Sequence, residues 1–261
     1  IIVGAKKDPE ASMWLNPQSW SVISGFASNE QGIKAMESVY NILNTPYGAK
    51  LLDPPYTKHY FNGALMHIFN SDTKENGGIF SQSQGWLILA EALLGHGGKA
   101  FEYFMESSPA AMNDKAEIRV IEPYAHGQFT ESSASPFEGR SHVHWLTGTA
   151  STVMVGCVEG ICGMRPDTDG LAVSPSIPAE WDGFTIEKQF RGKKLSIEIK
   201  NPDHVESGVA EIILNGERLE DNYIPAVKLA ENNIISVRMR KKNDRRAVFY
   251  DSPVLLTERK G

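Results

Sequence analysis

The chain of 261 residues contains only two cysteines, Cys157 and Cys162. They lie five residues apart on a segment with helical periodicity, which would point them to different faces of the helix and predicts neither a disulfide nor a metal pair. Sparse, unpaired cysteine is typical of a reducing compartment. A cytoplasmic location and no metal site are therefore expected.

Long hydrophobic runs and an excess of basic residues are also missing. No apolar run approaches the roughly 18 residues that a membrane span requires. The first residues, 1–7, are too short for a signal peptide and include no initiator Met, so we interpret the start as a cut within a longer chain. The net charge is −6 and the 26 basic residues are scattered, which argues against nucleic acid or a membrane surface as a partner.

The first 165 residues have the periodicity of helices. Asn16-Pro17 is expected to begin one helix that runs to about Ala27, and Ser28 to Gln31 form a capping box that begins another. Apolar spacing predicts three more helices, at 84–96, 99–106 and about 149–160. Helical hairpins alternate with long polar loops, among them 45–78, which suggests part of an α/α barrel whose loops gather at one mouth.

After Pro166 the period changes to that of short strands. Alternating apolar residues predict strands at 184–186, 195–199, 209–214, 234–239 and 247–250. Asn215-Gly216 lies between two apolar runs and is a strong signal for a hairpin turn. The predicted fold class is therefore mainly α followed by β, with a helical domain at 1–165 and a C-terminal two-layer β-sandwich at 166–261.

The most polar stretch is 122–149, which combines carboxylates, histidines and hydroxyls with two prolines and three glycines. Such a segment does not suit an ordinary helix or strand, and we interpret it as a ligand-binding loop. At its end, Thr147-Gly148-Thr149 leads into an apolar helical segment. Unpaired amides and hydroxyls there are suited to hold an anion, although the two threonines are equally expected to cap the helix.

Several residues of this stretch allow other interpretations. His142 and His144 could form a metal pair with His126, but no residue close in the sequence has the spacing of a third ligand. Packing or substrate contact is expected instead. Pairs among Glu122, Glu131 and Glu138 are suited to an inverting hydrolase. Four tryptophans lie beside helical apolar stripes and are expected in the core, namely Trp14, Trp20, Trp86 and Trp145, with Trp145 the first exception to consider for sugar stacking.

Five blocks together resemble glycoside hydrolase family 94, the inverting disaccharide phosphorylases that include cellobiose, chitobiose and cellobionic acid phosphorylases. The blocks are 74–80, 122–129, 145–149, 163–167 and 175–181. The resemblance implies phosphorolysis of a β-1,4-linked disaccharide to a sugar 1-phosphate, with inversion. It also implies an (α/α)6 barrel followed by a β domain, phosphate as a substrate rather than a cofactor, and a homodimer as one expectation for the full-length protein.

The family's site residues carry over to specific positions of this chain. Gln128, Thr147 and Gly148 match phosphate-binding residues, and Gln82 stands where the family has a phosphate-contacting histidine. Lys74 and Glu75 match residues that contact the acceptor sugar, and Phe69 falls where acceptor specificity varies. Ser71-Asp72 replaces a Pro-Gly, which predicts an added negative charge near the acceptor loop.

The catalytic acid of the family is an Asp in a block that this chain lacks. The resemblance therefore places no catalytic residue within 1–261 and implies the C-terminal part of a longer enzyme, inactive alone. A non-catalytic carbohydrate-binding remnant is the alternative that a full open reading frame would test.

Overall fold

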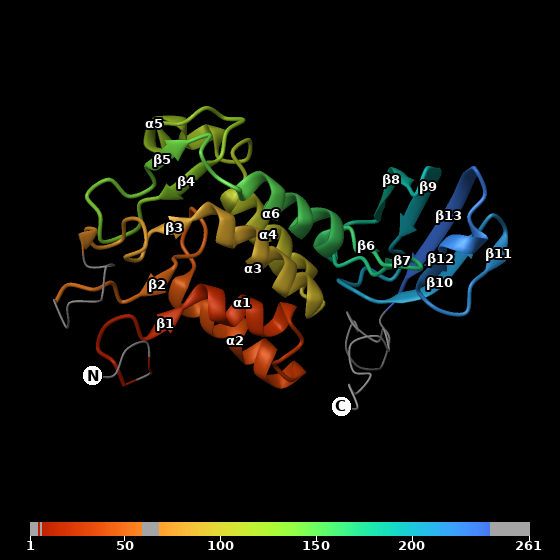
Figure 1. Ribbon diagram of the computed structural model, residues 1–261, viewed down its shortest axis with the longest axis horizontal. Coiled ribbons are helices and arrows are strands. Elements are labelled where there is room, and N and C mark those ends of the chain that lie inside the picture. The colour runs from red at the N-terminus through yellow and green to blue at the C-terminus, as the bar shows by residue number, and fades with distance from the viewer. Residues whose placement is uncertain (1–4, 6, 59–67, 241–261) are drawn as a thin grey trace, which may run out of the picture.

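The computed structural model describes residues 5, 7–58 and 68–240, so the predicted strand at 247–250 lies outside the described residues. Helices make up most of the first part of the chain and sheets the second, as the sequence predicted (Figure 1). Within the described residues no helix is both long enough and apolar enough to cross a membrane.

The first two helices form an adjacent pair, α1 (Leu15–Ile23) and α2 (Asn29–Leu43). The predicted start of α1 was two residues late, because the chain leaves strand β1 (Met13–Trp14) directly into the helix. Pro17 fits inside the first turn, where a backbone amide has no helical partner to lose. Strand β1 pairs with β2 (Leu52–Asp53), which the sequence had assigned to a loop.

The capping box of α2 is confirmed. Gln31 N donates to Ser28 Oγ over 3.2 Å, and Ser28 N donates to Gln31 Oε1 over 2.9 Å. These two bonds satisfy amide groups that the first turn of a helix leaves without partners.

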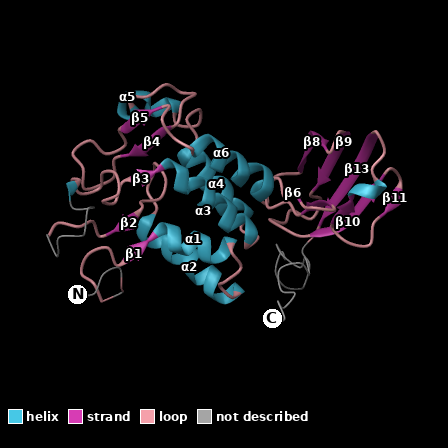
Figure 2. Ribbon diagram, in the orientation of Figure 1, coloured by secondary structure: helices cyan, strands magenta, loops and turns pink. Residues whose placement is uncertain are grey.

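Helix α3 (Ser81–Leu93) is the central element of the helical part. It packs against α1, α4 (Gly97–Ser107), α6 (Thr149–Val155) and the π-helical η3 (Gly156–Ile161), as Figure 2 shows. A glycine permits the close approach of α3 and α6, since a Cβ added to Gly85 of α3 would lie 2.3 Å from the carbonyl carbon of Thr152 in α6. This contact brings the first turn of α3 beside the first turn of α6.

The π-helical turn changes the interpretation of the cysteines. Cys162 N donates to Cys157 O over 2.8 Å, so the two residues lie one turn apart and not on different faces. Both are free thiols, and burial raises the pKa of Cys157 to about 11. A thiol that stays protonated is a poor nucleophile and a poor metal ligand.

A small antiparallel sheet contradicts the prediction of an irregular loop at 122–149. Strand β3 (Ile79–Phe80) pairs with β4 (Gly127–Thr130), and β4 pairs with β5 (Ser141–His144). Two short helical segments, η2 (Asn113–Lys115) and α5 (Ala116–Arg119), precede β4. In Figure 1 this sheet lies at the end of the molecule away from the C-terminal sheets.

Two sheets form the second part of the chain. The larger has the order β11-β10-β13-β9-β8, antiparallel except for the parallel pair β13 and β9, and the smaller has the order β12-β7-β6. Their strands are β6 (Met164–Pro166), β7 (Gly170–Val173), β8 (Gly183–Phe190), β9 (Lys193–Lys200), β10 (Val209–Leu214), β11 (Glu217–Arg218), β12 (Tyr223–Pro225) and β13 (Asn232–Met239). The four predicted strands that lie within the described residues are confirmed, as is the Asn215-Gly216 turn, with φ values of 51° and 89°.

The two parts meet at the turn between α3 and α4. Phe101 of α4 lies edge-to-face against Trp181, with ring centroids 5.0 Å apart. Close to this turn, Gly95 approaches Ser207 and Gly97 approaches the backbone of Ile177. One hydrophobic core runs through the helices and both sheets, so the sheets support the helical part directly.

Candidate functional site

Two of the predicted site residues, Lys74 and Gln128, lie together. Gln128 is on β4, and Lys74 Nζ donates to its Oε1 over 3.5 Å. The ammonium group also lies 5.6 Å from the ring centroid of Phe129 and 5.8 Å from that of Phe69. Lys74 therefore brings the predicted acceptor residue Phe69 next to the predicted phosphate residue Gln128.

Glu75, the second predicted acceptor residue, is exposed. It forms the tip of a turn that begins at Asp72, where φ is 59°, and continues through Lys74, where φ is 44°. Left-handed backbone at two non-glycine residues in one turn is uncommon and is held in place by the surrounding structure.

A second pair, Gln82 and Gly148, comes from the first turns of two helices. A Cβ added to Gly148 would lie 3.6 Å from Cδ and from Oε1 of Gln82. Thr152 Oγ1 donates to Gln82 O over 3.0 Å and joins α6 to α3 at this point. The residue that replaces the family histidine thus lies against the glycine of the predicted phosphate loop.

The Thr147 hydroxyl is engaged within its own loop. It lies 2.5 Å from Thr149 Oγ1 and accepts from Thr149 N over 3.2 Å. Thr147 thus bonds the first amide of α6 from the position before the N-cap, which is Gly148, and α6 has no side-chain cap of the kind that the sequence analysis gave as an alternative. Anion binding by Thr147 and Gly148 stays a prediction.

The two pairs are connected through the chain, because β5 pairs with β4 and leads within three residues to Thr147. Among the described residues, no hydrogen bond joins Lys74 or Gln128 to Gln82 or Gly148. A surface hollow of about 490 Å³ lies elsewhere, in the sheet part of the molecule, and contains none of these residues.

Glu131 has a structural partner on each carboxylate oxygen. His142 Nε2 lies 2.5 Å from Oε1, and the Ser135 hydroxyl donates to Oε2. The His142 ring stacks on Phe129 with centroids 5.0 Å apart. A buried carboxylate held in this way joins the end of β4 to β5 and so braces the β4–β5 hairpin.

The three histidines do not form a metal site within the described part of the chain. His144 Nδ1 lies 3.6 Å from Glu122 Oε2, so it faces a different partner from His142. Burial, followed by the nearby Arg119 guanidinium, lowers the pKa of His126.

Trp145, the expected exception among the tryptophans, is 64% exposed, but Trp20 is also 45% exposed, so the expectation of core packing was wrong for Trp20. Trp145 has a φ of 66°, and its ring centroid lies 5.8 Å from that of Tyr124. An exposed aromatic pair two residues before Thr147 has the chemistry of a sugar-stacking surface.

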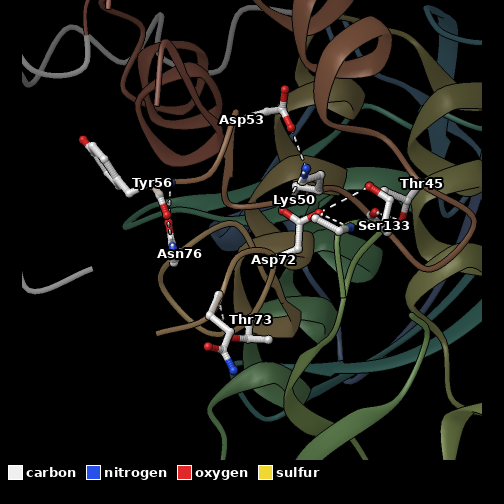
Figure 3. A network of polar contacts seen from close by, with 11 residues as sticks. Thr45, Lys50, Asp53, Tyr56, Asp72, Thr73, Asn76 and Ser133 are labelled. Atoms are coloured by element: carbon white, nitrogen blue, oxygen red, sulfur yellow. Dashed lines mark hydrogen bonds and ion pairs between the residues drawn. The ribbon is translucent and has the colours of Figure 1, made fainter. Parts of the chain in front are cut away.

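Asp72, which was expected to add a negative charge near the acceptor loop, is fully buried, and its Oδ1 lies 2.9 Å from Lys50 Nζ (Figure 3). Lys50 was not predicted from the sequence. The available signal was a single lysine between Ala49 and Leu51 in an apolar run. Such a lysine is expected to be buried and to need a partner of opposite charge.

Comparison with known proteins agrees with the family resemblance. The Glycosyl hydrolase 94 superfamily catalytic domain matches residues 2–163, and the Glycosyl hydrolase family 65 C-terminal domain matches residues 164–220. The chain is a member of the glycosyl hydrolase 94 superfamily.

Three relatives show the range of the similarity. The N,N'-diacetylchitobiose phosphorylase of Vibrio proteolyticus is 34% identical over 90% of this chain, and that of Vibrio furnissii is 36% identical over 84%. The cellobionic acid phosphorylase of Neurospora crassa is 32% identical over 77%. The matched residues make up 29%, 27% and 26% of those proteins, so the chain spans less than a third of their length.

Proposed function

We propose that residues 1–261 form the C-terminal part of an inverting phosphorylase, which cleaves a β-1,4-linked disaccharide with inorganic phosphate and releases a sugar 1-phosphate. The observation that carries the proposal is the match of residues 2–163 to the family's catalytic domain. Similarity to two chitobiose phosphorylases over most of the chain supports the same reaction class.

The proposed architecture follows from the same membership. The helices of 1–165 would form part of an (α/α)6 barrel, and 166–261 would form a two-layer β domain against it. The pairing of α1 with α2 and of α3 with α4 is consistent with such a barrel, and so is the core that the two C-terminal sheets share with the helices.

The candidate phosphate residues supply neutral donors. Lys74 donates to Gln128 Oε1, which leaves the amide nitrogen of Gln128 to donate to a phosphate oxygen. Gln82 and the amides of the first turn of α6 supply further donors. None of the four proposed phosphate residues is a carboxylate that would repel the dianion.

In the proposed reaction, a phosphate oxygen attacks the anomeric carbon from the face opposite the glycosidic oxygen. The new C–O bond forms as the old one breaks, and the leaving oxygen takes a proton from a general acid. Phosphate takes the place of the water that an inverting hydrolase activates, so one acid is sufficient. We place that acid outside residues 1–261 and expect this segment alone to be inactive.

Acceptor choice is assigned to Lys74, Glu75 and Phe69. The proposal names β-1,4-linked disaccharides of the chitobiose, cellobiose or cellobionic acid type. The Phe69 side chain lies beside the Lys74 ammonium, so its bulk would disfavour an N-acetyl group on the acceptor.

The test is cleavage by the full-length protein with and without phosphate. Chitobiose, cellobiose and cellobionic acid are incubated separately, and products are followed by phosphorus NMR and by reducing-sugar assay. The proposal expects a sugar 1-phosphate from at least one disaccharide and no cleavage without phosphate. Free sugars formed without phosphate would identify a hydrolase, and no cleavage under either condition would leave the non-catalytic alternative.

A further inference from the structure

We infer that Asp72, paired with the buried Lys50, is a positioning residue. It fixes the spacing between residues 72–76, here called the acceptor loop, and β4, the proposed phosphate-binding strand that carries Gln128. The inference rests on the proposed function for the meaning of those two segments. The geometry that carries it, a buried carboxylate shared by three segments of the chain, is independent of that function.

The ion pair lies in the interior. Lys50 is 5% exposed and Asp72 is fully buried. Lys50 Nζ lies 2.9 Å from Asp72 Oδ1 and 2.5 Å from Asp53 Oδ1, which ties the chain after α2 to the acceptor loop (Figure 3). Taking two charges out of water is costly, and it is compensated only where the geometry is good and further hydrogen bonds are made.

Those further bonds hold a third segment. Asp72 Oδ2 accepts from Ala134 N over 2.8 Å and from Ser133 Oγ over 3.3 Å, and Asp72 O accepts from Ser132 N over 3.0 Å. Residues 132–134 begin two positions after the end of β4 at Thr130, and Ser132 is four residues beyond Gln128. One aspartate therefore bonds the acceptor loop, through both side chain and backbone, to the continuation of the strand that carries Gln128.

The acceptor loop is closed at its other end by Asn76, which is also fully buried. Asn76 O accepts from Asp72 N over 2.8 Å, and the Asn76 side chain bonds both backbone groups of Tyr56 and the carbonyl of Phe69. Gly77, with a φ of 93°, leaves room for the carboxylate, because a Cβ there would lie 2.6 Å from Asp72 Oδ1.

This arrangement explains how Lys74 meets Gln128. Lys74 lies between two anchored residues, Asp72 and Asn76, and its ammonium reaches Gln128 Oε1. If Asp72 loses its hold on residues 132–134, the lysine and the glutamine are no longer held at one spacing. An error of about 1 Å in such a spacing lowers catalysis by as much as ~100-fold.

The experiment compares Asp72→Asn with wild type in the full-length protein. Asparagine keeps the shape and one acceptor oxygen but removes the charge. We expect the KM for phosphate and the KM for the acceptor sugar in the reverse reaction to rise together, with kcat/KM lowered about 10- to 100-fold. The exposed pair Lys193 and Glu231, 3.1 Å apart on the far sheet, supplies the control, and Lys193→Met is expected to leave both constants unchanged.

A second variant separates positioning from folding. Lys50→Met combined with Asp72→Asn removes both charges, so neither is left unpaired in the interior. We expect the melting temperature to recover relative to Lys50→Met alone while both KM values stay raised. KM values within twofold of wild type in Asp72→Asn and in the double variant would overturn the inference and leave the pair a structural role only.

Hydrogen exchange decides the inference even if the protein shows no phosphorolysis. Asp72→Asn is expected to speed amide exchange in 72–78 and in 131–135 together, with no change in β8 or β9. Faster exchange confined to 72–78 would show that Asp72 does not couple the two segments. Absent phosphorolysis by the wild type would contradict the proposed function and leave this result standing.

Discussion

The sheet β3-β4-β5 and the sheet β11-β10-β13-β9-β8 are held by different forces. In the larger sheet, buried apolar residues alternate with exposed polar ones, as in β9, where Leu195, Ile197 and Ile199 face the core. Around the sheet β3-β4-β5, three charged side chains are buried instead, namely Asp72, Lys50 and Glu131. Alternating apolar residues give a stable sheet against which the helical part packs. Paired buried charges instead fix the position of particular loops.

The largest expected effect is on the charged side of this comparison. Lys50→Met should lower the free energy of unfolding by about 3–5 kcal/mol, because it leaves the carboxylate of Asp72 buried without its cation. The matched control, Lys193→Met, breaks an exposed pair and should cost about 0–1 kcal/mol. Urea unfolding of the full-length protein measures both. Equal losses of unfolding free energy in the two variants would show that the buried Lys50–Asp72 pair contributes no more to stability than an exposed pair.

The next effect tests the apolar side. Ile235 of β13 is fully buried, and Ile235→Ala should cost about 2–5 kcal/mol through lost burial and the cavity left behind. Its neighbour Ile234 is 74% exposed, so Ile234→Ala should change stability by about 0.5 kcal/mol or less. Neither change should alter the KM for phosphate of the folded enzyme. A raised KM for phosphate in Ile235→Ala would mean that the packing of the C-terminal sheet affects the candidate phosphate site as well as stability.

The next prediction concerns how stability depends on pH, through two groups of the helical part, His96 after α3 and Glu106 in α4. The hydrogen bond that the His96 imidazolium donates to the Glu91 carboxylate raises the pKa of His96, so the stability from that pair is present below pH 6.5 and is lost as pH rises through the raised pKa. Burial raises the pKa of Glu106 to about 7, so stability is lost as pH rises from 4.5 through 7, where the buried carboxyl must ionise.

Both shifts therefore predict that the free energy of unfolding falls between pH 5 and pH 8. Glu106→Gln should flatten that fall, since the amide does not ionise, and the exposed Glu117→Gln should leave it unchanged. Denaturant unfolding at several pH values measures the slope. An unchanged slope in Glu106→Gln would assign the dependence to other groups.

The smallest effect concerns local structure alone. Ser28→Ala removes the side-chain cap of α2 and should cost about 1 kcal/mol. Ser38 lies in the exposed middle of the same helix, and Ser38→Ala should change stability by about 0.5 kcal/mol or less. Thermal unfolding of the two variants side by side makes the comparison.

Local signals in the sequence predicted what they act on directly. The capping box at Ser28 and Gln31 and the turn at Asn215 and Gly216 each depend on residues next to each other in the chain, and both are confirmed. The start of α1 at Leu15 was missed because it depends on pairing of β1 with a strand almost forty residues away.

The candidate site was predictable in its residue types but not in its supports. Gln82 was placed by family resemblance, and the structure lays it against Gly148. Asp72 was expected to add a negative charge near the acceptor loop, but its burial and its partners were not predicted, because nothing local shows that Lys50 and residues 132–134 converge on it. Long-range pairing of charges is a property of the fold, and no short sequence pattern carries it.

The measurement that tests the central claim most directly is the KM for phosphate of the full-length protein carrying Gln128→Ala. The account predicts a rise of about tenfold, equivalent to ~1.4 kcal/mol for one lost hydrogen bond to a charged ligand. Gln189→Ala on the exposed face of β8 is the matched control and should leave the constant unchanged. A phosphate KM equal to that of wild type in Gln128→Ala would contradict the assignment of β4 as the phosphate-binding strand.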